Sequence, residues 1–202
     1  MQKQFYFLII LTFLILVVGG IFLWGNFSKE AEEWLPGVRY ESPENYVIKD
    51  TTEGIIVENK SAGISFNVPN EWTADKEQIG TDQWIVNILS PEAELNDSGL
   101  LIKGCGVGAW IEYDEIIANL TREKIADPDW FSGGISGGYE KMEISGYSAL
   151  KTILENPEWG QSISIAVPRE DKIYVFDTRF LPEEMDRCSK AFEEFSAGVS
   201  IY

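Results

Sequence analysis

The chain contains two cysteines, Cys105 and Cys188, and no histidine. Two thiolates are too few for a four-cysteine zinc or iron–sulfur site. Without histidine the chain lacks both the usual ligand of catalytic zinc and the general base of a serine or cysteine triad. We therefore expect the cysteines to have a structural role, and the sequence predicts neither a resident metal nor a cofactor.

Two serine motifs are similar to those of known nucleophiles. The sequence GISGG at 134–138 matches the nucleophile elbow, whose Ser136 would need a histidine to accept its proton. Ser148 and Lys151 match the Ser-x-x-Lys motif. On the β-strand predicted here, a spacing of three places their side chains on opposite faces. We therefore expect no catalytic residue, and a hydrolase built on paired carboxylates is the weakest of three functional hypotheses.

Acidic loops supply the oxygen ligands that calcium prefers. They contain Glu92, Glu94, Asn96 and Asp97 in one cluster and Asp127 and Asp129 in another. Neither cluster follows the ligand spacing of an EF-hand loop, so solvated surface loops explain them equally well.

Three aromatic residues, Trp130, Phe131 and Trp159, fall in predicted loops. Exposed rings can stack on sugars or press against a partner protein, whereas in many small domains such residues close one end of the core. They are the candidate binding residues of the chain. Together with the acidic loops they define the alternative function, a receptor or binding module for a small ligand, either a glycan or calcium.

The charge of the chain limits its partners. The sequence has 33 acidic and 16 basic residues, a formal charge of −17, and Lys3 is the only charged residue among the first 28. Residues 29–202 therefore carry 33 acidic and 15 basic groups, a charge of −18. A nucleic-acid partner would need a basic surface. An acidic surface repels anionic lipid and favours basic protein partners.

Residues 5–24 form an uncharged apolar run of 20 residues. At about 1.5 Å per residue, a helix of this length spans the roughly 30 Å hydrocarbon core. The alternative is a cleaved signal peptide, but its apolar region would be shorter, and the end of this run offers no small-x-small cleavage site. The sequence therefore predicts a transmembrane signal-anchor at 5–24 after a short cytoplasmic tail at 1–4.

Orientation follows from Lys3 and the terminal amine, which favour a cytoplasmic amino terminus. We expect a single-pass protein of the cell membrane whose carboxy-terminal domain is extracytoplasmic. That compartment favours a disulfide between Cys105, on a glycine-rich strand, and Cys188, on the inner face of the last predicted helix. The alternative is two buried free thiols that behave as small hydrophobic side chains.

Residues 25–53 are acidic and contain Pro36, Gly37 and Pro43, a composition typical of a tether. From residue 54 to 202, runs of alternating apolar and polar residues predict β-strands, including hairpins at 139–155 and 161–180. Gly104, Gly106 and Gly108 indicate a bulge or sharp coil within the stretch 100–113. The domain is therefore expected to be α+β, an antiparallel sheet of six or seven strands packed with two helices.

Both predicted helices begin with recognisable signals. Asp114 is a suitable N-cap for a helix over 115–126, with Ile116, Ile117 and Leu120 as its expected buried stripe. Proline and acidic residues at 182–184 begin the second helix. Its apolar face is expected to contain Met185, Cys188, Phe192, Phe195 and Val199.

Three short segments carry a family resemblance: GISFNVPNEW at 63–72, ISGYSA at 144–149 and CSKAFEEFSAGVSIY at 188–202. They resemble an early strand that ends in Pro-x-x-Trp, a hydrophobic-x-Gly-x-x-Ala entry to a hairpin, and a closing helix in the PsbP-like family. This family includes an extrinsic protein of photosystem II and bacterial relatives. The resemblance covers about residues 54–202 and implies an α/β/α sandwich that acts by docking or ligand binding, without conserved catalytic chemistry.

The predicted anchor departs from the photosynthetic members of that family, which are soluble after processing, so a photosystem function is not implied. Charge, anchor and resemblance together predict a non-enzymatic, membrane-anchored extracytoplasmic domain that docks onto an envelope protein or complex.

Overall fold

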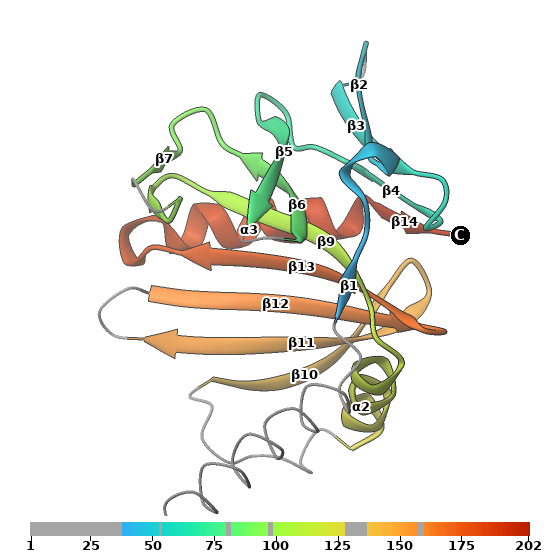
Figure 1. Cartoon of the computed structure of the whole chain (residues 1–202). Helices are drawn as coiled ribbons and strands as arrows, with labels where there is room; N and C mark the ends of the chain where they lie inside the picture. The colour runs from blue at the N-terminus through green and yellow to red at the C-terminus, as the bar shows by residue number, and fades with distance from the viewer. Residues whose placement is uncertain (1–37, 53, 80–81, 97–98, 128–136, 157–159) are drawn as a thin grey trace, which may run out of the picture. The chain divides into compact units, whose positions relative to one another are not determined.

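The structure, a computed structural model, describes residues 38–52, 54–79, 82–96, 99–127, 137–156 and 160–202. Residues 39–202 form one compact unit. Its largest element is an eight-stranded antiparallel sheet, the large sheet (Figure 1). In spatial order its strands are β10 (Gly137–Ile144), β11 (Tyr147–Asn156), β12 (Gly160–Arg169), β13 (Lys172–Phe180), β9 (Gly106–Tyr113), β6 (Gln83–Leu89) and β5 (Thr73–Ile79), with β1 (Arg39–Tyr40) paired to β9.

Two smaller antiparallel sheets complete the β-structure of the described residues. The small sheet has four strands, in the order β14 (Val199–Ile201), β4 (Ile64–Asn67), β3 (Gly54–Asn59) and β2 (Val47–Thr51). A two-stranded hairpin, β7 (Glu94–Leu95) with β8 (Leu101–Lys103), lies in the connection from β6 to β9.

The described α-helices are α2 (Glu115–Ala126) and α3 (Met185–Ala197), with short 3₁₀ turns η1 (Pro43–Asn45) and η3 (Pro182–Glu184). They pack on opposite faces of the large sheet. The inner face, which carries Val107, Ile165 and Phe176, shares one core with α3 and the small sheet. The outer face, which carries Trp110, Val175 and Asp177, packs against α2 over part of its area.

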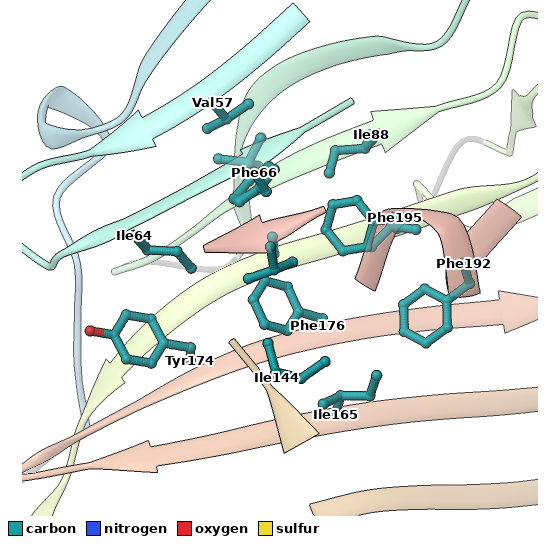
Figure 2. Packing of buried hydrophobic residues seen from close by; sticks show 14 of the residues in the cluster. Val57, Ile64, Phe66, Ile88, Ile144, Ile165, Tyr174, Phe176, Phe192 and Phe195 are labelled. Atoms are coloured by element: carbon teal, nitrogen blue, oxygen red, sulfur yellow. The ribbon is translucent and has the colours of Figure 1, made fainter. Parts of the chain in front are cut away.

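Phenylalanines join the three layers on the inner side (Figure 2). Phe195 of α3 lies between Phe66 of the small sheet and Phe176 of the large sheet, with ring centroids 5.4 and 5.7 Å away in edge-to-face contact. Phe192 stacks beside it at 6.2 Å. Burial of these rings removes a large apolar area from water and adds a favourable quadrupole contact. The core therefore depends on the inner face of α3.

The predicted disulfide is present: Cys105 and Cys188 are bonded across 83 residues of chain. Cys105 precedes β9, and its amide and carbonyl bond to Ser90, where the chain leaves β6. Cys188 lies on the buried face of α3. The disulfide therefore joins α3 to the place where the chain leaves β6 for the β7–β8 hairpin and returns to β9.

The mostly antiparallel sheet with two helices agrees with the predicted α+β class, but the expected count of six or seven strands was too low. The large sheet alone has eight strands, among them β1 from the segment assigned to the tether, and the small sheet adds four short strands that include β14 at the end of the chain. The final helix was predicted well: Cys188, Phe192 and Phe195 are buried, whereas Met185 is exposed and Val199 belongs to β14.

One buried carboxylate holds the segment that enters the domain. Glu41, with 6% of its surface exposed, accepts hydrogen bonds from the Ser42 amide at 3.0 Å, Asn45 Nδ2 at 2.6 Å and the Tyr113 hydroxyl. Residues 39–51, assigned to the tether from composition, therefore belong to the folded unit. The decisive partner, Tyr113, is 72 residues away, so local composition could not reveal it.

No helix in the described ranges is long and apolar enough to cross a membrane. The predicted anchor at 5–24 lies outside those ranges.

Loss of the disulfide is expected to lower the free energy of unfolding. The disulfide closes a loop with a separation of 83 residues, which lowers the conformational entropy of the unfolded chain. In the chain-entropy model this stabilises the folded state by about 4–5 kcal/mol. We expect full-length Cys105→Ala/Cys188→Ala to unfold at a clearly lower urea concentration than the wild type in the same detergent. Alkylation of denatured, unreduced wild type is the control and should label neither cysteine. Labelling of both would contradict the bond.

Candidate functional site

Helix α2 presents an apolar face to solvent. Its N-cap is Asp114, whose carboxylate accepts hydrogen bonds from the amides of Ile116 at 2.9 Å and Ile117 at 3.0 Å. Ile116, Ile117 and Leu120 are 51%, 39% and 46% exposed. We call these three side chains the α2 patch. Three large aliphatic side chains on two adjacent turns form a contiguous apolar surface.

The α2 patch is exposed because smaller residues fill the contact with the sheet. Ala118 is fully buried against Ile173 and Val175 of β13, with Trp110 and Ala166 packed beside them. The small side chain of Ala118 lets the helix lie close to the sheet. The expected burial of Ile116, Ile117 and Leu120 was therefore wrong.

Polar contacts fix the rotation of α2 about its axis. Thr121 and Lys124 are buried, and the Lys124 ammonium lies 4.3 Å from the centre of the Tyr139 ring on β10. At the surface, the Arg122 guanidinium donates a hydrogen bond to the Glu170 carbonyl in the β12–β13 turn. These contacts hold the apolar patch outward.

A second feature lies elsewhere on the outer face, where β9 lacks side chains at two successive outer positions, Gly106 and Gly108. The intervening inward residues, Val107 and Ala109, are buried in the core. Gly108 pairs with Asn87 on β6 and Asp177 on β13, and these neighbours carry side chains. This part of β9 lines a groove of about 230 Å³, the β9 groove.

The β9 groove has apolar walls and polar groups on both strands that flank β9, β6 and β13. Ile85, Leu89 and Trp110 provide apolar surface from the large sheet, and Leu95 and Leu101 provide it from the β7–β8 hairpin. The polar side chains that line it include those of Asn87, Asp177 and Arg179. The Asn87 amide donates a hydrogen bond to the Glu77 carboxylate on β5, which fixes its orientation.

Asp177 is the acidic residue that lines the groove. Burial raises the pKa of its carboxyl to about 6, and a hydrogen bond with Ser164, its cross-strand neighbour, opposes that effect. The carboxylate is ionised at neutral pH in a partly desolvated position. A desolvated anion attracts a cation more strongly than one in bulk water does.

The glycines of 104–108 have two distinct roles. Gly104, at φ +77°, forms the sharp turn between β8 and β9, where a Cβ would lie only 2.7 Å from the Ala93 Cα. Gly106 and Gly108 instead belong to a regular strand, and their pairing with β6 shows no bulge. The predicted sharp coil is therefore confirmed at Gly104. At Gly106 the Leu89 and Leu101 side chains already cover the strand, 3.1 and 3.7 Å from where a Cβ would lie, whereas a Cβ at Gly108 would make only ordinary contacts.

The candidate binding residues Trp130, Phe131 and Trp159 lie outside the described residues, as do Asp97 and Asp129 of the acidic loops. Of the remaining acidic residues, Glu92 forms an ion pair with Arg187, and Glu94 forms one with Lys103 at 2.6 Å. Within the described ranges no group of three or more acidic, cysteine or histidine side chains gathers as a metal site would require.

Ser148 and Lys151 both lie on β11, as the predicted strand requires. The Lys151 ammonium is paired with the Glu140 carboxylate on β10 at 2.9 Å. The odd spacing on a strand directs the two side chains to opposite faces, so they form no nucleophile–base pair.

The functional candidates that sequence reasoning missed are Asp177 and the outward face of α2. Asp177 had a usable signal, because a charged residue alternates there with buried aromatic positions on a strand. Its pairing with Gly108 could not be predicted from local sequence, because the two residues are 69 positions apart.

No family model matches the sequence, and no curated protein matches it significantly. Among solved structures, a protein from Bacteroides thetaiotaomicron has a TM-score of 0.43 and 11% identity, over 69% of this chain and 45% of that protein. This chain thus spans less than half of the Bacteroides protein.

Two further structures have a TM-score of 0.42. LpqN, described as involved in cell envelope biogenesis of Mycobacterium tuberculosis, is 15% identical over 68% of this chain and 82% of LpqN. The PsbP of the cyanobacterium Synechocystis (CyanoP) is 12% identical over 80% of this chain and 95% of CyanoP. A cyanobacterial PsbP is thus among the solved structures that this chain matches, at low identity.

The contribution of Asp177 to stability is expected to depend on pH. A carboxyl whose pKa is raised by folding, here from 3.8 to about 6, stabilises the native state below its unfolded pKa. That contribution is lost as the pH rises through about 6. We expect Asp177→Asn to be more stable than the wild type at pH 7.5, with most of the difference lost by pH 4. Urea unfolding at both pH values measures this, and a pH-independent difference would contradict desolvation of the carboxyl.

Proposed function

We propose that the chain is a non-enzymatic, membrane-anchored extracytoplasmic domain that docks onto an envelope protein or complex through the α2 patch. The observation that carries this proposal is the exposure of Ile116, Ile117 and Leu120 on a helix whose opposite side is fully packed. Large aliphatic side chains gathered on a rigid helix favour burial against another surface.

The charge of the domain supports a protein partner. Residues 39–202 contain 30 acidic and 14 basic residues, a charge of −16. The α2 patch is flanked by Asp114, Glu115 and Glu123 on the same helix. These groups would repel the anionic surface of a membrane. A protein surface that is apolar at its centre and basic at its rim complements the α2 patch and its acidic border.

The path of the chain supports a partner at the membrane. Arg39, the first residue of the folded unit, pairs with Tyr113, and Tyr113 directly precedes the N-cap of α2. The 14 residues between the predicted anchor and Arg39 reach at most about 50 Å when fully extended. The proposed partner is therefore itself bound to, or embedded in, the envelope membrane.

The alternative, a glycan or calcium receptor, depends on Trp130, Phe131 and Trp159 and on acidic loops. The aromatic residues lie outside the described ranges, and Glu92 and Glu94 are already paired with cations. No contact in the described part of the chain favours this alternative over docking.

We expect Ile116→Ser/Leu120→Ser to weaken docking at least about tenfold, because two apolar side chains would be lost from the centre of the interface. The readout is chemical cross-linking of full-length protein in its native membrane, followed by mass spectrometry of a stoichiometric partner. Leu100→Ser/Ile102→Ser is the matched control, since these residues are equally exposed on and beside β8, away from α2.

Cross-linking should persist in the control variant and fall in the α2 variant, with unchanged urea midpoints in both. Equal yields from the two variants would show that the α2 patch is not the docking surface.

A further inference from the structure

The β9 groove lies outside the α2 patch and plays no part in the proposed docking. It combines three properties of a small-molecule site: a floor without a side chain at Gly108, apolar walls, and a partly desolvated carboxylate at Asp177. Few, well-placed polar groups in an otherwise apolar pocket are typical of ligand sites.

We propose that the β9 groove binds a small organic cation with an aliphatic chain, such as a primary alkylammonium ion. Its ammonium group would pair with the Asp177 carboxylate. Its chain would lie over Gly108, along Ile85 and Trp110, toward Leu95 and Leu101 of the β7–β8 hairpin. This inference concerns a different surface from the docking proposal and does not depend on it.

The size of the groove limits the ligand. A volume of about 230 Å³ is below the roughly 300–1,000 Å³ of pockets that hold drug-sized molecules. A single short chain therefore fits better than a ring system. The walls suit such a chain, because Ile85, Leu89, Leu95, Leu101 and Trp110 all present apolar atoms.

The charge favours a cation over a neutral or anionic ligand. Asp177 is flanked across the strands by Ser164 and Gly108, and neither of these carries a charge. Arg179 lies two residues further along β13, and Glu77 on β5 is hydrogen-bonded to Asn87. The net charge of −16 on residues 39–202 also raises the local concentration of cations.

The position of Asp177 leaves an ammonium group room to approach it. Gly108 pairs directly with Asp177 and carries no side chain that would lie beside Asp177 on the outer face. A Cβ built at Gly108 would lie in ordinary contact, 3.6 Å from Trp110 and 3.8 Å from Ile85. A Cβ there is therefore tolerated by the strand, and the two further methyl groups of a valine would extend into the space that the ligand needs.

The test is titration calorimetry of full-length protein in detergent at pH 7.5 with n-hexylammonium chloride. Hexanol and sodium hexanoate are matched probes that keep the chain and change its head group. We expect saturable binding of hexylammonium, at least tenfold weaker binding to Asp177→Asn and to Gly108→Val, and no saturable binding of the other two probes. Asp171→Asn, which removes an exposed acid from the β12–β13 turn, is the matched control and should bind like the wild type.

Binding should also weaken as the pH falls below about 6, because the pKa of Asp177, at about 6, sets where its carboxylate is protonated. Equal binding to wild type and Asp177→Asn would overturn the proposal, as would hexanol binding as tightly as hexylammonium. Preferential binding of hexanoate would overturn it too and would indicate Arg179 as the recognising group. Failure of Gly108→Val to fold would leave the decision to the isosteric Asp177→Asn variant.

Discussion

The register of strand β9 determines how its neighbouring strands are placed. The side chains of β9 alternate strictly between two environments. Val107, Ala109 and Ile111 point inward and are almost fully buried in the main core. Gly106, Gly108 and Trp110 point outward. β9 pairs with β13, β6 and β1, so its register determines which residues of the neighbouring strands face each side. A shift of one residue would exchange the core and the groove.

The connections of β9 at both ends explain how that register is held. Before the strand, Cys105 is bonded to Cys188 of α3, whose Phe195 packs between the two sheets. At its other end, Tyr113 binds the buried Glu41 and leads directly into the N-cap of α2. One strand thus links the disulfide, the core helix, the entry of the chain and the helix with the exposed apolar patch.

How much of this could be predicted from sequence depended on whether the decisive contact was local. The buried face of α3 and the hairpins of β10–β11 and β12–β13 follow from periodicity, and the structure confirms them. The face that α2 buries was predicted wrongly, because periodicity identifies the apolar stripe but not whether small residues such as Ala118 allow closer packing. The role of Glu41 depends on Tyr113, 72 residues away. Asp177 can be recognised as a candidate binding residue only from the structure, which places Gly108 beside it.

The outer face of the large sheet carries the α2 patch, which we propose docks onto a protein, and the β9 groove, which we propose binds a small cation. The α2 patch depends on the close packing of Ala118 against β13. The cation proposal depends on Gly108 and on the partly desolvated carboxyl of Asp177 beside it. Carbon-13 NMR titration of the Asp177 carboxyl tests this most directly, with Asp177→Asn used to assign the signal. We expect a midpoint near pH 6, lowered when hexylammonium is added, because a bound cation favours the ionised form. A midpoint near 3.8 that does not respond to the amine would contradict it.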